Sequence, residues 1–287
     1  MKLFLNLFFS AKCACLITAL FGSSCLLAID KKIKKLTFSE TQEWGEHEQW
    51  FLNNWKLSYT KTSDYEKAIE SLPKPPALKT ASLKRELAYL EGLQKLRKNQ
   101  DIAAIEREKH LCGFWLGDYR FGLNEKVDEL ILKVYFDARL WGFKAKKHFN
   151  RVRPSFLENA LQPSIENPPH PAYPSNHTFQ ALVVASLLAD LHPTKAQFYI
   201  KDALQIGRNR EVAGVHYPSD TEASVILANQ FLRVVKKHPG FNEAFEKVKA
   251  KKFGMKWRKK DDRKDYAECL KSTMQWAVKN KVYKKAK

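Results

Sequence analysis

Six prolines fall between residues 154 and 174, in a chain whose other long stretches show helical spacing. Proline has no backbone N–H and fixes φ, so this stretch cannot be a continuous helix and is expected to form a loop. Before the loop, apolar residues recur at steps of three and four from Val127 to Trp141, which predicts a helix over 125–148. The loop therefore separates two helical blocks.

Apolar spacing and helix-terminating residues predict more helices on both sides of the loop. They are expected at residues 82–98, 101–110, 175–191, 195–213, 218–238, 241–251 and 264–285. No stretch alternates in the manner of a strand. The prediction is an all-α fold, a single helical-bundle domain at 81–251 with an irregular lead-in at 29–80 and a basic helical extension at 252–287.

The first 28 residues have the order of a secretory signal. Lys2 and Lys12 give a basic start, an apolar run follows from Cys13 to Phe21, and Ala28 supplies a small residue for cleavage. We expect removal of residues 1–28 and a periplasmic or secreted protein. The alternatives are an uncleaved membrane anchor, for which the apolar run is short, and a lipoprotein anchored at Cys25, which lacks the usual preceding leucine.

Cysteine and charge outside this segment leave two questions open. Cys112 and Cys269 are the remaining cysteines, and in an exported chain they are either a disulfide or two buried thiols. The formal net charge is +19, and residues 251–287 hold 14 Lys or Arg against 4 Asp or Glu. Such a tail could contact an anionic surface, although a solvated helix face is the commoner case, and no specific nucleic-acid partner is expected.

Three short motifs supply groups that handle phosphate. They are Lys146-x6-Arg153-Pro154, Pro174-Ser175-Asn176-His177 and Arg210-x5-His216-x3-Asp220. Each motif alone is ordinary, but together and in this order they provide cations, a hydroxyl, two imidazoles and a carboxylate. This set suffices for phosphoryl transfer through histidine without a metal, because positioning and charge stabilisation lower that barrier.

The spacing within the motifs suggests how these groups work. Ser175 is placed to cap the helix that follows, and the backbone N–H groups behind it would face a bound anion, which the helix dipole favours. Asp220 follows His216 by one helical turn, so its carboxylate can accept a hydrogen bond from one ring nitrogen. The other nitrogen is then left as a nucleophile.

The motifs and their flanking residues resemble the type-2 phosphatidic acid phosphatase superfamily, and within it the secreted class A nonspecific acid phosphatases of bacteria. The resemblance is best from about Tyr135 to Lys251. It implies that His216 attacks phosphorus, that Asp220 orients it and that His177 serves as acid and then base. The phosphate oxygens would be bound by Lys146, Arg153, Ser175, Asn176 and Arg210. It further implies vanadate-inhibited hydrolysis of small phosphomonoesters with no cofactor or metal.

Two positions depart from the family pattern, which has glycine where this chain has Asn176 and favours serine where it has Asn209. Neither change removes a catalytic group, but both bear on substrate range. The rival functions are a phosphatase for lipid or polyprenyl phosphates, a vanadium-dependent haloperoxidase and a non-catalytic cationic binding protein. The sequence disfavours a zinc enzyme and a serine hydrolase, because it lacks His-Glu-x-x-His, Cys-x-x-Cys and Gly-x-Ser-x-Gly.

Overall fold

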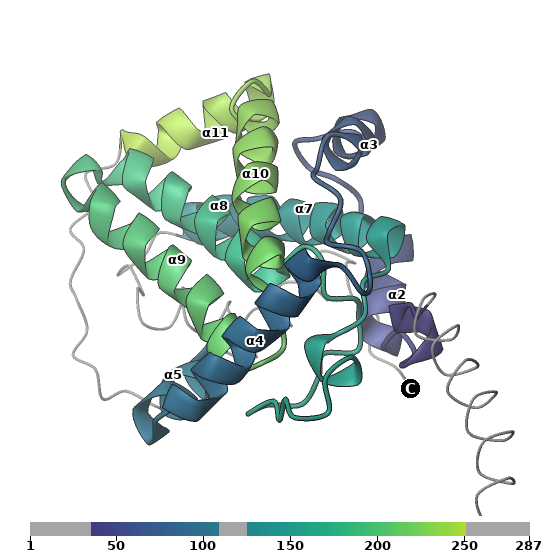
Figure 1. Cartoon of the computed structure of the whole chain (residues 1–287). Coiled ribbons are helices and arrows are strands. Elements are labelled where there is room, and N and C mark those ends of the chain that lie inside the picture. The colour runs from purple at the N-terminus through teal and green to yellow at the C-terminus, as the bar shows by residue number, and fades with distance from the viewer. Residues whose placement is uncertain (1–35, 109–124, 251–287) are drawn as a thin grey trace, which may run out of the picture. The chain divides into compact units, whose positions relative to one another are not determined.

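Helix α8 (Asn176–Leu191) lies at the centre of the computed structural model, which describes residues 36–108 and 125–250 (Figure 1). Its side chains are apolar or small on nearly every face, and a helix of this kind is buried on all sides. It packs against α7 (Glu125–Phe149), α9 (Ala196–Val212) and α10 (Pro218–Val235). This packing brings the ends of four helices close to one another.

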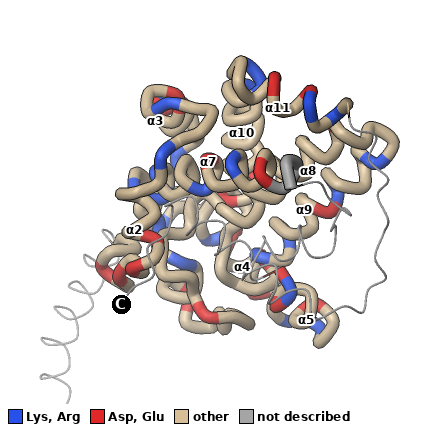
Figure 2. Tube along the Cα trace, turned by 180° about the vertical axis from the view of Figure 1, so that it is seen from behind, with Lys and Arg blue, Asp and Glu red and all other residues tan. Residues whose placement is uncertain are grey.

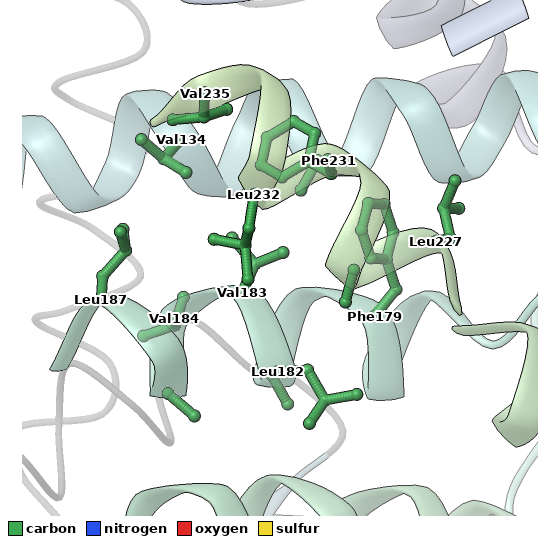
Figure 3. Close-up of a cluster of buried hydrophobic side chains, with 14 of the residues drawn as sticks. Val134, Phe179, Leu182, Val183, Val184, Leu187, Leu227, Phe231, Leu232 and Val235 are labelled. Carbon is green, nitrogen blue, oxygen red and sulfur yellow. The ribbon is translucent and has the colours of Figure 1, made fainter. Parts of the chain in front are cut away.

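The main core fills the space between α7, α8 and α10. Figure 3 shows Phe179 and Val183 of α8 facing Phe231 and Leu232 of α10, with Val134 of α7 beside them. The rings of Phe179 and Phe231 meet edge to face with centroids 5.7 Å apart. Such a pair contributes about 0.5–1.5 kcal/mol beyond the burial of its apolar surface. These contacts fix the helices whose ends carry the candidate site.

The all-α fold is confirmed, since the described residues contain helices and no strand. The helices predicted within the described residues appear with small shifts at their ends, and the proline-rich stretch is a loop with one short 3₁₀ turn. Further helical segments are α4 (Ala81–Leu96), α5 (Asn99–Arg107), α11 (Pro239–Lys249), η1 (Phe38–Glu40), η3 (Pro154–Phe156) and η4 (Pro193–Lys195).

The irregular lead-in expected over 29–80 is a wrong prediction for its described part. Two nine-residue helices form there, α2 (Glu46–Asn54) and α3 (Thr62–Glu70). Helices this short are marginal in isolation, so their stability comes from tertiary packing that the sequence pattern does not reveal. Phe51 of α2 stacks on Trp55 at 5.4 Å, and both rings contact Phe136 of α7. The helical body therefore begins well before residue 81.

Several predicted features lie outside the described residues: the signal segment, Cys112, Cys269, the basic tail and the helix at 264–285. Across 36–108 and 125–250, no helix combines the length and the apolar character that crossing a membrane requires. Charged positions of both signs are interspersed along α5 and α11 (Figure 2), as is typical of solvated helix surfaces.

Candidate active site

The three sequence motifs converge at the helix ends around α8. Lys146 lies in the last turn of α7, and Ser175 caps α8. Arg210 lies in the last turns of α9, and Asp220 lies in the first turn of α10. The motif side chains are buried, except for the half-buried His177 at the second position of α8. The fold thus gathers into one site the groups that the motifs predicted.

His216 and Asp220 form the centre of this site. Gly214 has a φ of +78°, which lets the chain turn sharply between α9 and α10 and present His216. The imidazole Nδ1 lies 2.9 Å from Asp220 Oδ2, which also accepts the backbone N–H of Tyr217 at 3.1 Å. The carboxylate is fully buried. It therefore holds the ring in one orientation.

Arg153 determines which nitrogen of His216 carries the proton. Its Nη1 lies 3.0 Å from His216 Nε2 and donates to the Val215 carbonyl at 2.7 Å. A guanidinium has only donors, so Nε2 must be the acceptor and Nδ1 must bear the hydrogen that faces Asp220. Burial, followed by the charges of Arg153 and Lys146, holds the pKa of His216 well below its usual value. The ring is neutral, with its lone pair on Nε2.

Arg210 is the cation of this site whose hydrogen-bonding capacity is only partly used. Its Nη2 donates to the Ile105 carbonyl at 2.8 Å and to Glu108 Oε2 at 3.1 Å. Its Nε and Nη1 are buried, with no hydrogen-bond partner in the described part of the chain. Native structures satisfy nearly all buried donors, so two unpartnered guanidinium nitrogens near His216 are suited to a ligand that accepts hydrogen bonds.

Lys146 is arranged differently from the two arginines. Its ammonium donates to the carbonyls of Pro171, Ala172 and Pro174 at 2.7, 2.9 and 2.6 Å. Burial, together with the charge of Arg153, nevertheless holds its pKa well below the ordinary value. All three donors of the ammonium are engaged, so Lys146 braces the proline-rich loop and adds positive charge without presenting a donor to a ligand.

The start of α8 bears out the predicted cap. Ser175 Oγ accepts the N–H of Thr178 at 3.4 Å and its hydroxyl at 3.0 Å. The Asn176 side chain lies flat against Gly142 of α7, where a Cβ atom would come within 1.8 Å of Asn176 Oδ1. Gly142 thus makes room for the side chain that replaces the family's glycine. Both polar atoms of this amide are buried and unpaired among the described residues.

The second departure, Asn209, has a definite partner. Its Nδ2 donates to Glu108 Oε1 at 2.6 Å, and the other oxygen of the same carboxylate binds Arg210. Burial raises the pKa of Glu108, against the opposing effect of Arg210. Asn209 and Arg210 are therefore held by one carboxylate about a hundred residues away in the chain, which sequence spacing could not have indicated.

His170 is another site residue that the sequence reasoning missed. Its backbone carbonyl accepts Arg153 Nε at 3.2 Å and Nη2 at 2.8 Å, and its Nδ1 lies 3.1 Å from the same Nη2. The ring is packed against Phe143 and Trp44. Burial and the nearby charges of Lys146 and Arg153 hold its pKa well below the usual value. His170 therefore orients Arg153 as a neutral acceptor.

The chain is similar to known proteins. Residues 130–242 match the family model of the PAP2 superfamily. A non-specific acid phosphatase of Providencia stuartii is 22% identical over 207 residues, covering 67% of this chain and 84% of that protein. One from Salmonella typhimurium is 32% identical over 110 residues, which is 37% of this chain and less than half, 44%, of that protein.

Among solved structures, a bacterial vanadium-dependent iodoperoxidase superposes with a TM-score of 0.55 at 14% identity. The match covers 71% of this chain and 61% of that one. At this identity the likeness concerns the fold, which is the same kind of helical bundle. In its motifs and in its helical fold, the segment of residues 130–242 is therefore similar to the PAP2 superfamily.

Proposed function

We propose that this chain is a metal-independent acid phosphatase that hydrolyses phosphomonoesters through a phosphohistidine at His216. The observation that carries the proposal is the juxtaposition of a neutral His216, whose lone pair is on Nε2, with two orphaned donors of Arg210. A tetrahedral oxyanion would complete the hydrogen bonds of these donors. The similarity of this chain to non-specific acid phosphatases supports the coarser part of the proposal, that it is a phosphatase.

In the first half of the proposed reaction, the phosphate group of the substrate accepts hydrogen bonds from Arg210 and Arg153. Arg153 Nη1 then leaves His216 Nε2, which frees the lone pair for in-line attack. A P–N bond forms while the P–O bond to the alcohol breaks. His177 donates a proton to the departing oxygen. The arginines and Lys146 offset the charge on the phosphoryl oxygens, which is the main way to lower such a barrier.

In the second half, water hydrolyses the phosphohistidine. His177, now neutral, takes a proton from the water as its oxygen attacks phosphorus and the P–N bond breaks. The electron pair of that bond returns to Nε2, and inorganic phosphate leaves. The charge of His177 acts on His216, so the two imidazoles are close enough to influence each other. Asp220 holds Nδ1–H throughout, which keeps Nε2 aimed at phosphorus.

Activity in acid also follows from the burial of His216. An ordinary histidine is mostly protonated at pH 5 and cannot act as a nucleophile. In this site, burial and the surrounding cations disfavour a further positive charge, so the ring keeps its lone pair in acid.

The test is hydrolysis by the purified protein with EDTA present, followed by rapid quenching. We expect turnover of phosphomonoesters, inhibition by vanadate and a phosphoenzyme that is labile to acid and stable to base. Activity that disappears with the chelator and returns with a divalent metal would refute the mechanism. The variant His216→Ala should form no phosphoenzyme. Its matched control is His192→Ala, at the far end of α8 and about 24 Å from the start of that helix.

Two rival functions, a lipid phosphatase and a haloperoxidase, are tested with other substrates in the same experiment. Preference for phosphatidic acid or polyprenyl phosphate in vesicles over soluble esters would favour a lipid phosphatase, which the basic tail would help to dock. Peroxide-dependent oxidation of iodide after loading with vanadate, without phosphatase activity, would favour a haloperoxidase, the activity named for the structural neighbour.

We also propose that the protein is exported and that residues 1–28 are removed. The support is the order of basic, apolar and small residues at the N-terminus. Mass spectrometry of the periplasmic or secreted protein measures the new N-terminus directly. An intact Met1 on exported protein would contradict the proposal.

A further inference from the structure

Arg151 is a buried cation that the proposed mechanism does not use. It lies two residues before Arg153, and its guanidinium bridges two acidic side chains. Nη1 donates to Asp220 Oδ1 at 2.6 Å, and Nη2 donates to Glu86 Oε2 at 2.8 Å. The guanidinium carbon also lies 3.6 Å from the centroid of the Tyr217 ring. Arg151 is thus held by charge on two sides and by an aromatic face.

The network continues from Arg151 to the helix that carries Asp220. Glu86 of α4 accepts the backbone N–H of Ser219 at 2.8 Å through its second oxygen. Arg151 Nη1 also donates to the Ser219 hydroxyl at 2.8 Å. Both ends of the network therefore clamp the first turn of α10. Burial alone would lower the pKa of Arg151, but Asp220 and Glu86 raise it on balance, so the guanidinium stays charged.

Asp220 consequently divides its two oxygens between two partners. Oδ1 faces Arg151, while Oδ2 faces Nδ1 of His216. A carboxylate whose full charge fell on an imidazole would favour protonation of that ring. Sharing the charge with a guanidinium weakens this effect and leaves the hydrogen bond that fixes the tautomer.

We propose that Arg151 is a positioning residue that holds the Asp220 carboxylate in place and takes up part of its charge, so that His216 keeps an unprotonated Nε2 in acidic solution. The proposal rests on the proposed function of His216 as nucleophile. The proposal also gives α4 an indirect part in catalysis, because Glu86 of this helix holds Arg151 without touching the reacting groups.

The other charged and titratable groups around His216 act in the same direction as Arg151 or hold the ring. The groups that face it come from α7, the proline-rich loop, α8, α9 and α10, and are Lys146, Arg153, His170, His177, Arg210 and Asp220. Asp220 is the single anion in this set. Arg151, the partner of Asp220 Oδ1, therefore determines how strongly the Asp220 charge favours protonation of the His216 ring.

The experiment measures the protonation of His216 in two ways, by ring-nitrogen NMR titration and by the acidic limb of the kcat/KM profile. In Arg151→Met we expect both to move to higher pH by about one unit. The negative charge of Asp220 lies at hydrogen-bond distance from His216, where an opposite charge changes a pKa by one to three units, and Arg151 now offsets part of that effect. Arg151→Lys should lie between this variant and the wild type, because it keeps the charge and loses the fork geometry.

Glu86→Gln separates charge sharing from a loss of packing. It leaves Arg151 with Asp220 as its sole carboxylate, so the acidic limb should stay in place or move to lower pH. A merely structural network would give changes of the same sign in the Glu86 and Arg151 variants. Arg139→Met is the matched control, because Arg139 contacts Glu48 and the rings of Phe51 and Phe143 and makes no contact with Asp220.

An unchanged His216 titration in both Arg151 variants would overturn the proposal. If Arg151→Met does not fold, Arg151→Lys decides the question by the same measurement. If the wild-type protein hydrolyses no phosphomonoester, the proposed function fails, while the NMR titration still tests the role of Arg151.

Discussion

Two buried charged regions at different places along α7 are satisfied in opposite ways. Asp137, near the middle of the helix, is fully buried and accepts the indole N–H of Trp55 and the backbone N–H groups of Ser58 and Tyr59. Near the end of the same helix, the cation cluster of Lys146, Arg153 and Arg210 is equally buried. Two nitrogens of Arg210, however, have no hydrogen-bond partner among the residues that the structure describes.

The difference separates a charge that the chain itself satisfies from one that, under the proposed function, a substrate phosphate would satisfy. A buried charge is costly unless hydrogen bonds surround it, so evolution retains an incomplete set mainly where another molecule completes it. Asp137 has its donors supplied by the chain and ties the segment between α2 and α3 to α7. In the cation cluster, Arg210 Nε and Nη1 have no acceptor within residues 36–108 and 125–250. Changes in the first region should therefore affect stability, and changes in the second should affect activity.

The largest effect should follow from His216→Ala. Without Nε2 no phosphoenzyme can form, so we expect turnover of every substrate to fall by roughly 10⁴-fold or more. The free energy of unfolding, measured in urea without ligand, should change far less than activity does. Phosphoenzyme trapped in this variant would show that another residue is the nucleophile.

Much of this site could be predicted from the sequence, because motif order and spacing fix which groups meet at the helix ends. The supporting residues could not. Arg151 is 65 residues from Glu86, and Arg210 is 102 residues from Glu108. Such pairs depend on how α4 and α5 pack against the site, and no local periodicity encodes that packing. Helix α2 was missed for a related reason, since its stability resides in contacts with α7.

The next effect concerns His177→Ala and depends on the leaving group. For alkyl phosphates the loss of the proton donor should lower kcat by about 10²–10⁴-fold. Nitrophenyl phosphate leaves with little protonation, so its first step should be much less affected. Rapid-quench kinetics should then reveal accumulated phosphohistidine, because His177 also activates water. Equal losses for good and poor leaving groups would refute the assignment.

Arg210→Met should lower kcat/KM by about 10²–10³-fold, the usual cost of losing a donor that stabilises transition-state charge. The variant also leaves the buried Glu108 carboxylate without its cationic partner, so the free energy of unfolding without ligand should fall by up to about 3–5 kcal/mol, and kcat/KM is compared per folded molecule. The control is Arg208→Met on the same helix, where a half-exposed arginine pairs with Glu211.

Protection by vanadate sharpens the Arg210 experiment. Vanadate should raise the melting temperature of the wild type and of Arg208→Met, since a ligand that binds the native state stabilises it. It should have much less effect on Arg210→Met. Equal protection of all three proteins would mean that the orphaned donors are not the anion site, and the contrast with Asp137 would lose its basis.

The smallest effect is the pH dependence of Asp137, and it tests the structural side of the contrast. Burial raises the pKa of this carboxyl to about 6 from 3.8, although the N–H donors lower it in part. The native state then binds more protons than the unfolded state between about pH 4 and 6. Stability from this group should therefore be highest near pH 4 and fall as pH rises to about 6, by up to about 3 kcal/mol.

Asp137→Asn isolates this contribution, because asparagine does not titrate. Its amide N–H₂ would face a backbone or indole donor, so the variant should be less stable by about 1–3 kcal/mol near pH 4. Since only the wild type loses stability from this group as pH rises, the difference between the two proteins should shrink toward pH 6.5. Urea unfolding at several pH values measures this difference, and kcat per folded molecule should remain within a few-fold of wild type.

A difference in stability that grows with pH would mean that the N–H donors outweigh burial and favour the carboxylate. Asp137 would then be a satisfied anion in the full sense, and its opposition to the incomplete cation cluster would be stronger than the raised pKa implies.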